Sequence, residues 1–279
     1  MIIRSDFHLH SCVSPCGDLL MSPAVIVKTL KEKHIQLAAL TDHNTALNCP
    51  AFAKCCRDAG IAALYGMEAQ TAEELHVLCL FPVLRTAIDF CTAWYDSLPD
   101  IRNKPEITGD QVYVDENDEI VGEVEKYLIT SAPWTLDECA AMVHKAGGLV
   151  IPAHVDRPAF SMMSQLGAIV EGSWDALEFV RPQVLQEQKE RTRDSVADTE
   201  GRKEKMQGKL LNERQAVSAL EIKLPAPYPV ITSSDAHYVE HIGRRAFNLD
   251  IGDMPLMDSD GTVNIPAVLS GLEKRVVQP

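Results

Sequence analysis

The sequence lacks a long uninterrupted run of apolar residues. None of its hydrophobic segments approaches the roughly 20 residues that a helix needs to cross a bilayer. The chain opens with Met1, Ile2 and Ile3, which read as the start of a strand rather than a signal peptide. We therefore expect a cytoplasmic protein without a membrane partner.

Positive charge is also scarce. The chain carries 26 Lys and Arg residues against 40 Asp and Glu residues, for a formal net charge of −14. A surface of this sign repels a phosphate backbone, which disfavours nucleic acid as a partner. Bound divalent cations would offset part of the local negative charge, so nucleic acid stays possible.

Paired CxxC motifs are missing as well. With no export signal, we interpret the eight cysteines as reduced thiols that serve mostly as small core residues. Hydrophobic residues make up 46% and charged residues 24% of the 279 positions, which is ordinary for a globular protein. This length suits one large α/β domain or two small ones, and we expect a single domain over 1–279.

What the sequence does contain is an alternation of strand and helix patterns. Apolar, strand-like runs are predicted near 2–10, 36–40, 61–65, 75–81, 149–153, 176–180, 229–233 and 247–251, and helices near 24–33, 51–59, 84–98, 135–146 and 265–274. Such repetition predicts a parallel sheet with helices outside it. We expect all the candidate ligands at the carboxyl ends of strands, which favours a barrel, because closure brings those ends together. With about seven of these runs as strands of the barrel, we expect it to be incomplete or distorted.

Two segments interrupt the alternation. A polar insert at about 101–133 contains two short β patterns around the turn 115–118, which predicts a β-hairpin. A charged segment at about 183–223 places Glu187 and Arg191 at the spacing of a helical ion pair. We interpret this second segment as a solvated helical arm, with a partner-binding element as the alternative.

Histidines and carboxylates gather at the ends of these strands. His8 and His10 are two residues apart in a strand pattern, so their side chains lie on the same face. Six further candidate ligands follow other strand-like runs: His43, Glu68, His76, His154, Asp235 and His237. Nitrogen and oxygen ligands of this kind suit zinc, manganese or iron. Because one tetrahedral ion cannot use them all, we expect a cluster of two or three divalent ions with Glu68 as a candidate bridge.

Clusters of this kind are suited to hydrolysis of phosphate esters. Two ions about 3.5–4 Å apart activate water and neutralise charge on the attacking and leaving oxygens. Phosphate esters gain most from this help because their uncatalysed hydrolysis is so slow, although amide hydrolysis is also chemically possible. Arg157 and Arg244 could bind the phosphate, with a structural salt bridge as the alternative for Arg157. His241 could orient a ligand or protonate the leaving group.

The candidate ligands also carry a family resemblance. His8-x-His10, Thr41-Asp42-His43, the pair Glu68 and His76, Ala153-His154 and Ser234-Asp235-Ala236-His237 occur in the order that is typical of the PHP family, named for polymerase and histidinol phosphatase. The match extends over nearly the whole chain apart from the two inserts. It implies a distorted seven-stranded (β/α)7 TIM-like barrel, a trinuclear metal site and phosphoesterase activity.

The resemblance further implies how the ligands are shared. One metal would be held by His8, His10, Glu68 and Asp235, and a second by Glu68, His76 and His154. The third would take His43, His237 and a residue from the loop after His10. The sequence departs from the family there, because Pro15 stands where a His or Asp is usual and the nearest carboxylate is Asp18. Asp42 is expected to orient a neighbouring histidine, with a role as a metal ligand as the alternative.

Two alternatives to a phosphatase of small phosphorylated substrates stay open. PHP modules also support nuclease or proofreading-type activity, which would require a basic track beside the site. The chain could also be a non-catalytic metal-binding interaction module that works through the segment 183–223.

Overall fold

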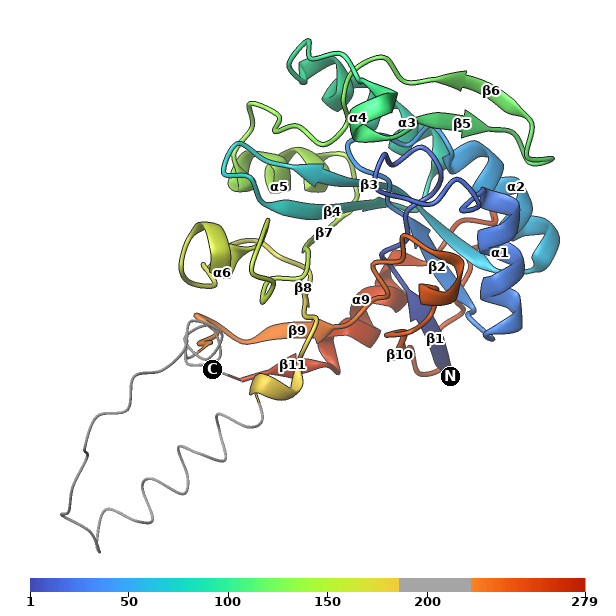
Figure 1. The fold of residues 1–279 in the computed structure, drawn as a ribbon. Coiled ribbons are helices and arrows are strands. Elements are labelled where there is room, and N and C mark those ends of the chain that lie inside the picture. The colour runs from blue at the N-terminus through green and yellow to red at the C-terminus, as the bar shows by residue number, and fades with distance from the viewer. Residues whose placement is uncertain (186–221, 279) are drawn as a thin grey trace, which may run out of the picture.

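A computed structural model describes residues 1–185 and 222–278 of the chain. Its centre is a curled six-stranded sheet (Figure 1) with the order β10 (Phe247–Asp250), β1 (Ile2–Asp6), β2 (Leu37–Leu40), β3 (Ala62–Gln70), β4 (His76–Phe81) and β7 (Leu149–Pro152). A smaller sheet has the order β11 (Val276–Val277), β9 (Tyr228–Ile231) and β8 (Leu177–Glu178). The predicted α/β class is thus confirmed as a half-barrel related to the TIM-like barrel, while the strands of these two sheets do not form one seven-stranded ladder.

The directions of the strands correct one expectation. β1, β2 and β3 are parallel, but β4 is antiparallel to both β3 and β7, and β10 is antiparallel to β1. The prediction of a wholly parallel sheet is therefore wrong. The connection from Gln70 to His76 is too short for a helical crossover, so β3 and β4 form a hairpin, whose strands must run antiparallel.

This hairpin also changes how two candidate ligands are placed. Glu68 lies within β3, which continues to Gln70, and His76 is the first residue of β4. The expectation that every ligand sits at the carboxyl end of a strand is wrong for His76. Because β4 runs in reverse, its amino end lies at the edge where β1 and β2 end, and the side chain still reaches the same place.

Hydrogen bonds connect the two sheets on both sides. The Asp175 amide, just before β8, donates to Val150 O of β7 at 2.9 Å. On the other side, the His10 amide donates to Ala236 O at 3.0 Å, and Leu9 and Ala236 form a parallel β-bridge. The loop after β9 is thereby held against the end of β1.

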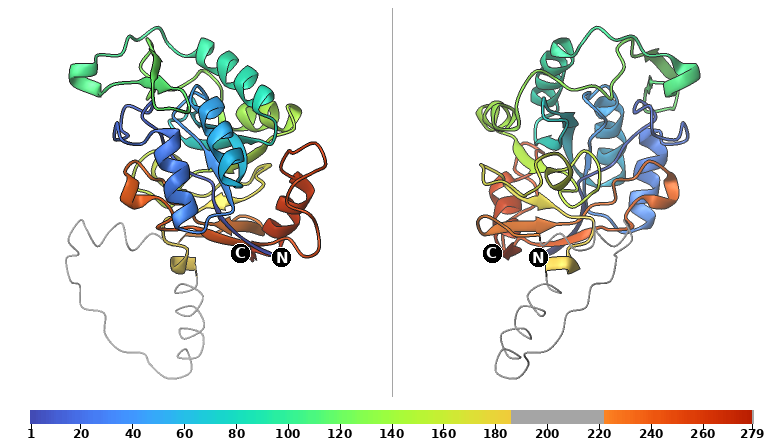
Figure 2. Two further views of the ribbon diagram at one scale, coloured as in Figure 1. Left: turned by 90° about the vertical axis from the view of Figure 1, so that its right-hand side faces the viewer. Right: turned by 60° about the vertical axis from the view of Figure 1, so that its left-hand side comes forward.

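Helices pack along the outside of the curled sheet (Figure 2), and their bounds agree with the predicted patterns: α1 (Pro23–Glu32), α2 (Cys49–Ala59), α3 (Leu84–Ser97), α5 (Leu136–Lys145) and α9 (Ile265–Glu273). Ser22 caps α1 by accepting from the Val25 amide, and Thr135 and Glu138 form a capping box at α5. Short helical turns were not predicted: α4 (Pro105–Thr108), α6 (Met162–Gln165) and the 3-10 turn η3 (Val239–His241).

The core lies on both faces of the sheet. In β2, Leu37 and Ala39 pack into one hydrophobic cluster, while Ala38 and Leu40 pack into another. Successive side chains of a strand point to opposite faces, so a strand covered on both sides is apolar at every position. This double burial holds the sheet rigidly beneath the residues that follow its strands.

The predicted hairpin in the first insert is confirmed. Strands β5 (Val112–Val114) and β6 (Ile120–Glu123) form a two-stranded sheet that projects beyond the main sheet (Figure 1). Asn48 of the main body fixes it by accepting a hydrogen bond from the Val114 amide at 2.8 Å. The predicted charged segment 183–223 falls almost entirely outside the described residues. None of the described helices has the length and apolar character that would span a bilayer.

Candidate metal centre

Imidazoles from several strands converge on the carboxylate of Glu68, whose side chain is 1% exposed. The distances from its Oε1 are 2.9 Å to His76 Nδ1, 3.0 Å to His154 Nε2 and 3.2 Å to His8 Nε2, and those from its Oε2 are 3.0 Å to His43 Nδ1 and 3.3 Å to His10 Nε2. These histidines come from the segments after β1, β2 and β7 and from the start of β4. The fold thus places five imidazoles from distant parts of the chain around one buried carboxylate.

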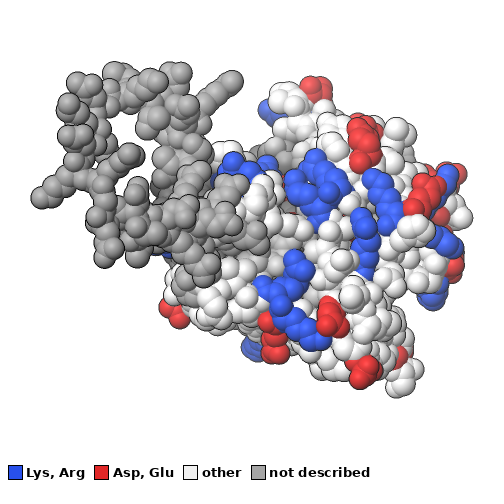
Figure 3. All heavy atoms as spheres, turned by 90° about the horizontal axis from the view of Figure 1, so that it is seen from below, with Lys and Arg blue, Asp and Glu red and all other residues white. Residues whose placement is uncertain are grey.

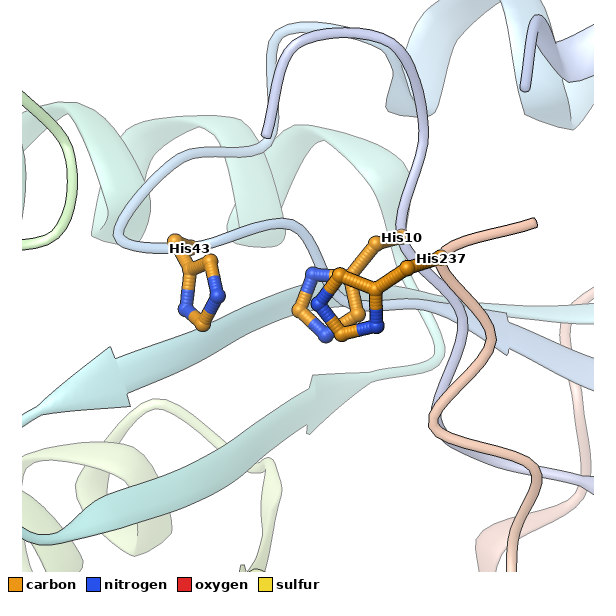
Figure 4. Close-up of side chains that lie close together, drawn as sticks. All are labelled: His10, His43 and His237. Carbon is orange, nitrogen blue, oxygen red and sulfur yellow. The ribbon is translucent and has the colours of Figure 1, made fainter. Parts of the chain in front are cut away.

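Asp235 and His237, from the loop after β9, complete the cluster. Asp235 Oδ1 lies 3.5 Å from both His8 Nε2 and His10 Nε2. The His237 ring stacks on that of His10 with centroids 4.2 Å apart, and His43 faces the pair from another loop (Figure 4). Ligand atoms lie within 4.8 Å of one another in three groups: His8, His10 and Glu68; His43, Glu68 and His76; and His10, His43 and His237.

Several buried polar atoms in this cluster lack a hydrogen-bond partner among the described residues. These atoms are His76 Nε2, His154 Nδ1 and Asp235 Oδ1, together with His43 Nδ1, which lies 3.0 Å from Glu68 Oε2 without the geometry of a hydrogen bond. Leaving such groups unpaired in a protein interior is costly, so native structures normally satisfy them. Nitrogen and carboxylate oxygen atoms with free lone pairs are the ligands that zinc, manganese and iron accept. The residues present therefore fit divalent metal ions.

The electrostatics of the carboxylates also suit cations. Burial opposes ionisation of Glu68, but nearby His76, His8 and His43 outweigh it and hold the pKa of Glu68 well below its usual range. Burial likewise opposes ionisation of Asp235, yet His8 and His10 keep its pKa well below the usual range. Both carboxylates are therefore negatively charged at neutral pH, which is the form that binds metal ions.

The pKa values of three histidines in the cluster shift in opposite directions. Burial lowers the pKa of His43 well below its usual range and, with the neighbouring His10, lowers the pKa of His237 to about 3. Both rings are therefore neutral, as metal ligands must be. His8 differs: burial acts against its charged form, but Glu178, Glu68 and Asp235 raise its pKa well above the usual range. A divalent cation between these carboxylates would take over the charge that the proton on His8 supplies.

Left-handed backbone conformations gather around the cluster. His154, Asp235 and Asn44 have φ values of 32°, 47° and 51°. Residues other than glycine rarely adopt this conformation, and it persists where the surrounding structure enforces it, often at functional sites. Two hydrogen bonds constrain Asn44: its Oδ1 accepts from the Gln70 amide at 2.9 Å and from Trp94 Nε1 at 2.7 Å.

Asp42 does not join the three ligand groups. Its Oδ1 accepts hydrogen bonds from the Ser11 amide at 2.6 Å and from Ser14 Oγ at 2.7 Å. Ser14 Oγ in turn lies 3.1 Å from His10 Nδ1. Asp42 therefore orients His10 through Ser14, leaving His10 Nε2 directed at the cluster.

Of the remaining predicted residues, the two arginines lie beside the cluster, whereas Asp18 lies outside the three ligand groups. Arg157 Nη1 donates to Asp235 Oδ2 at 3.0 Å, and Arg244 Nε donates to Ser234 O at 2.8 Å, so both arginines border the cluster. Asp18 Oδ1 instead accepts from the Leu20 amide at 2.8 Å, outside the three ligand groups. His241 packs edge-on against Tyr238, with ring centroids 5.4 Å apart.

The sequence analysis did not single out Glu178. This residue is 2% exposed and lies in β8, where its Oε2 is 2.9 Å from His8 Nδ1. The available signal was an acidic residue in the middle of the apolar run Ala176 to Val180. A buried charge of this kind needs a partner, and in this fold the partner is a histidine of the cluster.

Comparison with known proteins places the chain in a family. The PHP domain matches residues 6–202, which is more than half of the chain, so this protein belongs to the PHP family. No curated protein matches the chain.

Three solved structures are similar. The lesion-specific endonuclease PfuEndoQ from Pyrococcus furiosus matches with a TM-score of 0.60 and 17% identity, over 97% of this chain and 56% of that chain. Endonuclease Q in complex with a 27-mer duplex that carries an abasic lesion matches with a TM-score of 0.54 and 17% identity, over 91% of this chain and 54% of that chain. A putative metal-dependent phosphoesterase from Bifidobacterium adolescentis matches with a TM-score of 0.45 and 17% identity, over 98% of this chain and 96% of that chain. At this identity the likeness to the endonucleases shows the fold alone, and the chain spans only about half of their length.

Proposed function

We propose that this protein is a metal-dependent phosphoesterase that hydrolyses a phosphate ester with two or three divalent ions. The convergence of five imidazoles on Glu68, all within 3.3 Å of its oxygens, supports this proposal most directly. Membership of the PHP family agrees with it. We also propose that residues 1–279 form one domain with a distorted (β/α)7 barrel, because Asp235 and His237, beyond the family match, belong to the same cluster.

The proposed ligand sets are those that the resemblance to the PHP family implies. His8, His10, Glu68 and Asp235 would hold one ion, Glu68, His76 and His154 a second, and His43 and His237 a third, for which Asp18 would have to turn away from the Leu20 amide. Bound ions of zinc, manganese or iron would supply activation of water and neutralise charge on the phosphate. Glu68, which contacts both of the first two sets, would fix the distance between their ions.

Two arginines are proposed to bind the phosphate. The side chain of Arg157 is 36% exposed and already pairs with Asp235, while Arg244 is held against the carbonyl oxygens of Ser234 and Asp235. A planar guanidinium beside the cluster can bind two phosphate oxygens at once and stabilise the negative charge that develops on them. His241 is proposed to protonate the leaving group, which would require it to turn from Tyr238.

Elemental analysis combined with a substrate panel tests this function. Purified protein should carry two or three equivalents of a divalent metal and should hydrolyse at least one phosphomonoester or phosphodiester. Treatment with a chelator should abolish that activity, and the same metal should restore it. Protein that holds no metal after exposure to zinc, manganese and iron would contradict the proposal.

A nucleic acid phosphodiester is the second candidate substrate, and a basic surface favours it. Lys and Arg side chains gather on the lower face of the molecule (Figure 3), although the chain as a whole is acidic. Arg4 is the register partner of Asn248 across β1 and β10, and Arg275 donates to Asn248 O, so Arg4 and Arg275 lie close together, while Lys33 donates to Ile242 O. Arg275 and Lys33 donate their hydrogen bonds to carbonyl oxygens, and neither forms an ion pair with a carboxylate among the described residues.

Charge reversal on this surface separates the two candidates. If the substrate is nucleic acid, the double variant Arg4→Glu and Lys33→Glu should weaken binding of a labelled DNA duplex at least tenfold and flatten its salt dependence. The exposed Arg57 and Arg85, on α2 and α3, provide the matched control when both are changed to Glu. Equal binding by all three proteins, or no binding to DNA, would leave small phosphate esters as the substrate class.

A further inference from the structure

Glu178 connects two of the candidate ligands through a single oxygen atom. Its Oε2 lies 2.9 Å from His8 Nδ1 and accepts a hydrogen bond from the backbone amide of His154, also at 2.9 Å. One carboxylate of β8 thus touches the segments that follow β1 and β7. Glu178 belongs to none of the three ligand groups. It therefore contacts two candidate ligands without being one of them.

The contact with His8 determines how that ring presents its nitrogen atoms. When Nδ1 carries the proton and donates it to Glu178, the lone pair is left on Nε2. His8 Nε2 faces the cluster, at 3.2 Å from Glu68 Oε1 and 3.5 Å from Asp235 Oδ1. A carboxylate that accepts a hydrogen bond from Nδ1 also makes Nε2 a stronger electron donor to a metal ion.

The contact with His154 acts on the backbone. His154 has a φ of 32°, a conformation that a residue with a side chain adopts only under constraint. The hydrogen bond from its amide to Glu178 supplies part of that constraint. In this conformation His154 Nε2 lies 3.0 Å from Glu68 Oε1.

We propose that Glu178 is a positioning residue that holds His8 and His154 in the orientations needed to bind metal. This role rests on the proposed metal site and deepens it. His10 is held in a different way, by the neutral hydroxyl of Ser14 with Asp42 behind it. Removing Glu178 should therefore weaken binding of the two ions that share Glu68, while binding at His43 and His237 should not change.

Two substitutions and one control test the role. Glu178→Ala removes both hydrogen bonds, whereas Glu178→Gln keeps an oxygen acceptor and removes the charge. Asp175→Asn is the matched control: Asp175 accepts from the Val150 amide at 2.7 Å and from His144 Nε2 at 2.9 Å, at the same junction of β7 and β8, and neither of these partners is a candidate ligand. Zinc and manganese affinities are measured by competition with a chelator at constant pH.

We expect Glu178→Ala to lower metal affinity by about 10- to 100-fold, the range for groups that orient metal ligands. Glu178→Gln should lose less, and Asp175→Asn should bind as the unaltered protein does. A spectroscopic readout accompanies this: in the zinc-loaded, nitrogen-15-labelled protein, the His8 Nδ1 proton should give a strongly deshielded signal. That signal should persist in Asp175→Asn, move in Glu178→Gln and vanish in Glu178→Ala.

The outcomes distinguish positioning from a structural role. Wild-type affinity in Glu178→Ala and Glu178→Gln would overturn the proposal, as would an equal loss in Asp175→Asn. If Glu178→Ala does not fold, Glu178→Gln decides by the same criteria. If the unaltered protein binds no metal, the proposed function fails together with this role, whereas metal binding that is insensitive to Glu178 overturns only this role.

Discussion

The cluster has two halves that are built differently. In the hairpin half, Glu68 and His76 belong to paired strands, where Glu68 opposes Leu78 and Gln70 opposes His76. In the loop half, Asp235 and His237 follow β9 in a segment held by side chains such as Arg157. The His237 side chain is 21% exposed, against 5% for His76. The hairpin half fixes positions through a strand ladder, while the loop half is partly exposed at His237 and contacts Arg157 and Arg244.

This difference indicates that the two halves of the cluster have different roles. A ladder of backbone hydrogen bonds tolerates little displacement, so it suits the ligands that set the distance between two ions. A loop can adjust to an incoming phosphate, which suits the residues nearest the substrate. We therefore expect substitutions in the hairpin half to remove metal and activity together, and those in the loop half to have smaller effects.

The largest effect is expected from Glu68→Ala. Glu68 contacts five imidazoles, so its loss should abolish activity, by at least about 1,000-fold, and reduce metal content while leaving the fold largely intact. Metal analysis, turnover and circular dichroism measure the three quantities. Glu74→Gln, an exposed position in the turn of the same hairpin, is the control and should behave as the unaltered protein. Full activity in Glu68→Ala would refute the assignment.

A smaller loss is expected in the loop half from Asp235→Asn. The amide keeps one oxygen near His8 and His10 but removes a negative charge and the ion pair with Arg157. Activity should fall about 10- to 100-fold, while most of the metal is retained. Turnover and metal content of this variant are compared with those of Glu68→Ala. If Asp235→Asn loses metal as completely as Glu68→Ala does, the two halves do not differ as proposed.

The support of the hairpin half is tested by Asn44→Ala. The Asn44 side chain donates to Leu128 O at 2.7 Å and accepts from Trp94 Nε1 at 2.7 Å, and its backbone is left-handed. Losing these buried hydrogen bonds should lower the free energy of unfolding by about 2–3 kcal/mol. Urea unfolding monitored by Trp fluorescence measures the change. A stability within about 0.5 kcal/mol of the original would show that Asn44 does not brace this region.

The smallest effect concerns pH and the loop half. Burial and the neighbouring His10 lower the pKa of His237 to about 3, below the usual value of 6.5. Between these values the unfolded chain binds a proton at this position and the folded protein does not, so acidification through this window destabilises the fold. Metal-free His237→Gln should therefore lose less stability between pH 6.5 and 4.5 than the unaltered protein. Parallel urea titrations that show equal slopes would contradict this expectation.

Local features of the sequence predicted the helices well. Ser22 before α1, the Thr135 and Glu138 capping box at α5 and the left-handed Gly60 after α2 all mark helix ends by interactions within a few residues. The hairpin in the first insert was predicted for the same reason. The direction of β4 was missed, because a strand's apolar pattern is the same in either direction.

The candidate ligands could be named from the sequence because metal ligands are few in kind and follow strands. Their partners could not be named in the same way. Glu178 contacts His8 across 170 residues of sequence, and the Asp18 side chain accepts from the nearby Leu20 amide and lies outside the three ligand groups. No local pattern records which of several carboxylates a folded loop will bring to a histidine.

By itself, the sequence determined the α/β class, the helix ends and the set of histidines and carboxylates that could bind metal, because these depend on neighbouring residues and side-chain chemistry. Only the tertiary structure decided that β4 runs in reverse, that Glu68 stands at the centre and that Glu178 holds His8. Those outcomes depend on contacts between segments far apart in the chain, whose geometry is fixed when the sheet curls and the core packs on both of its faces.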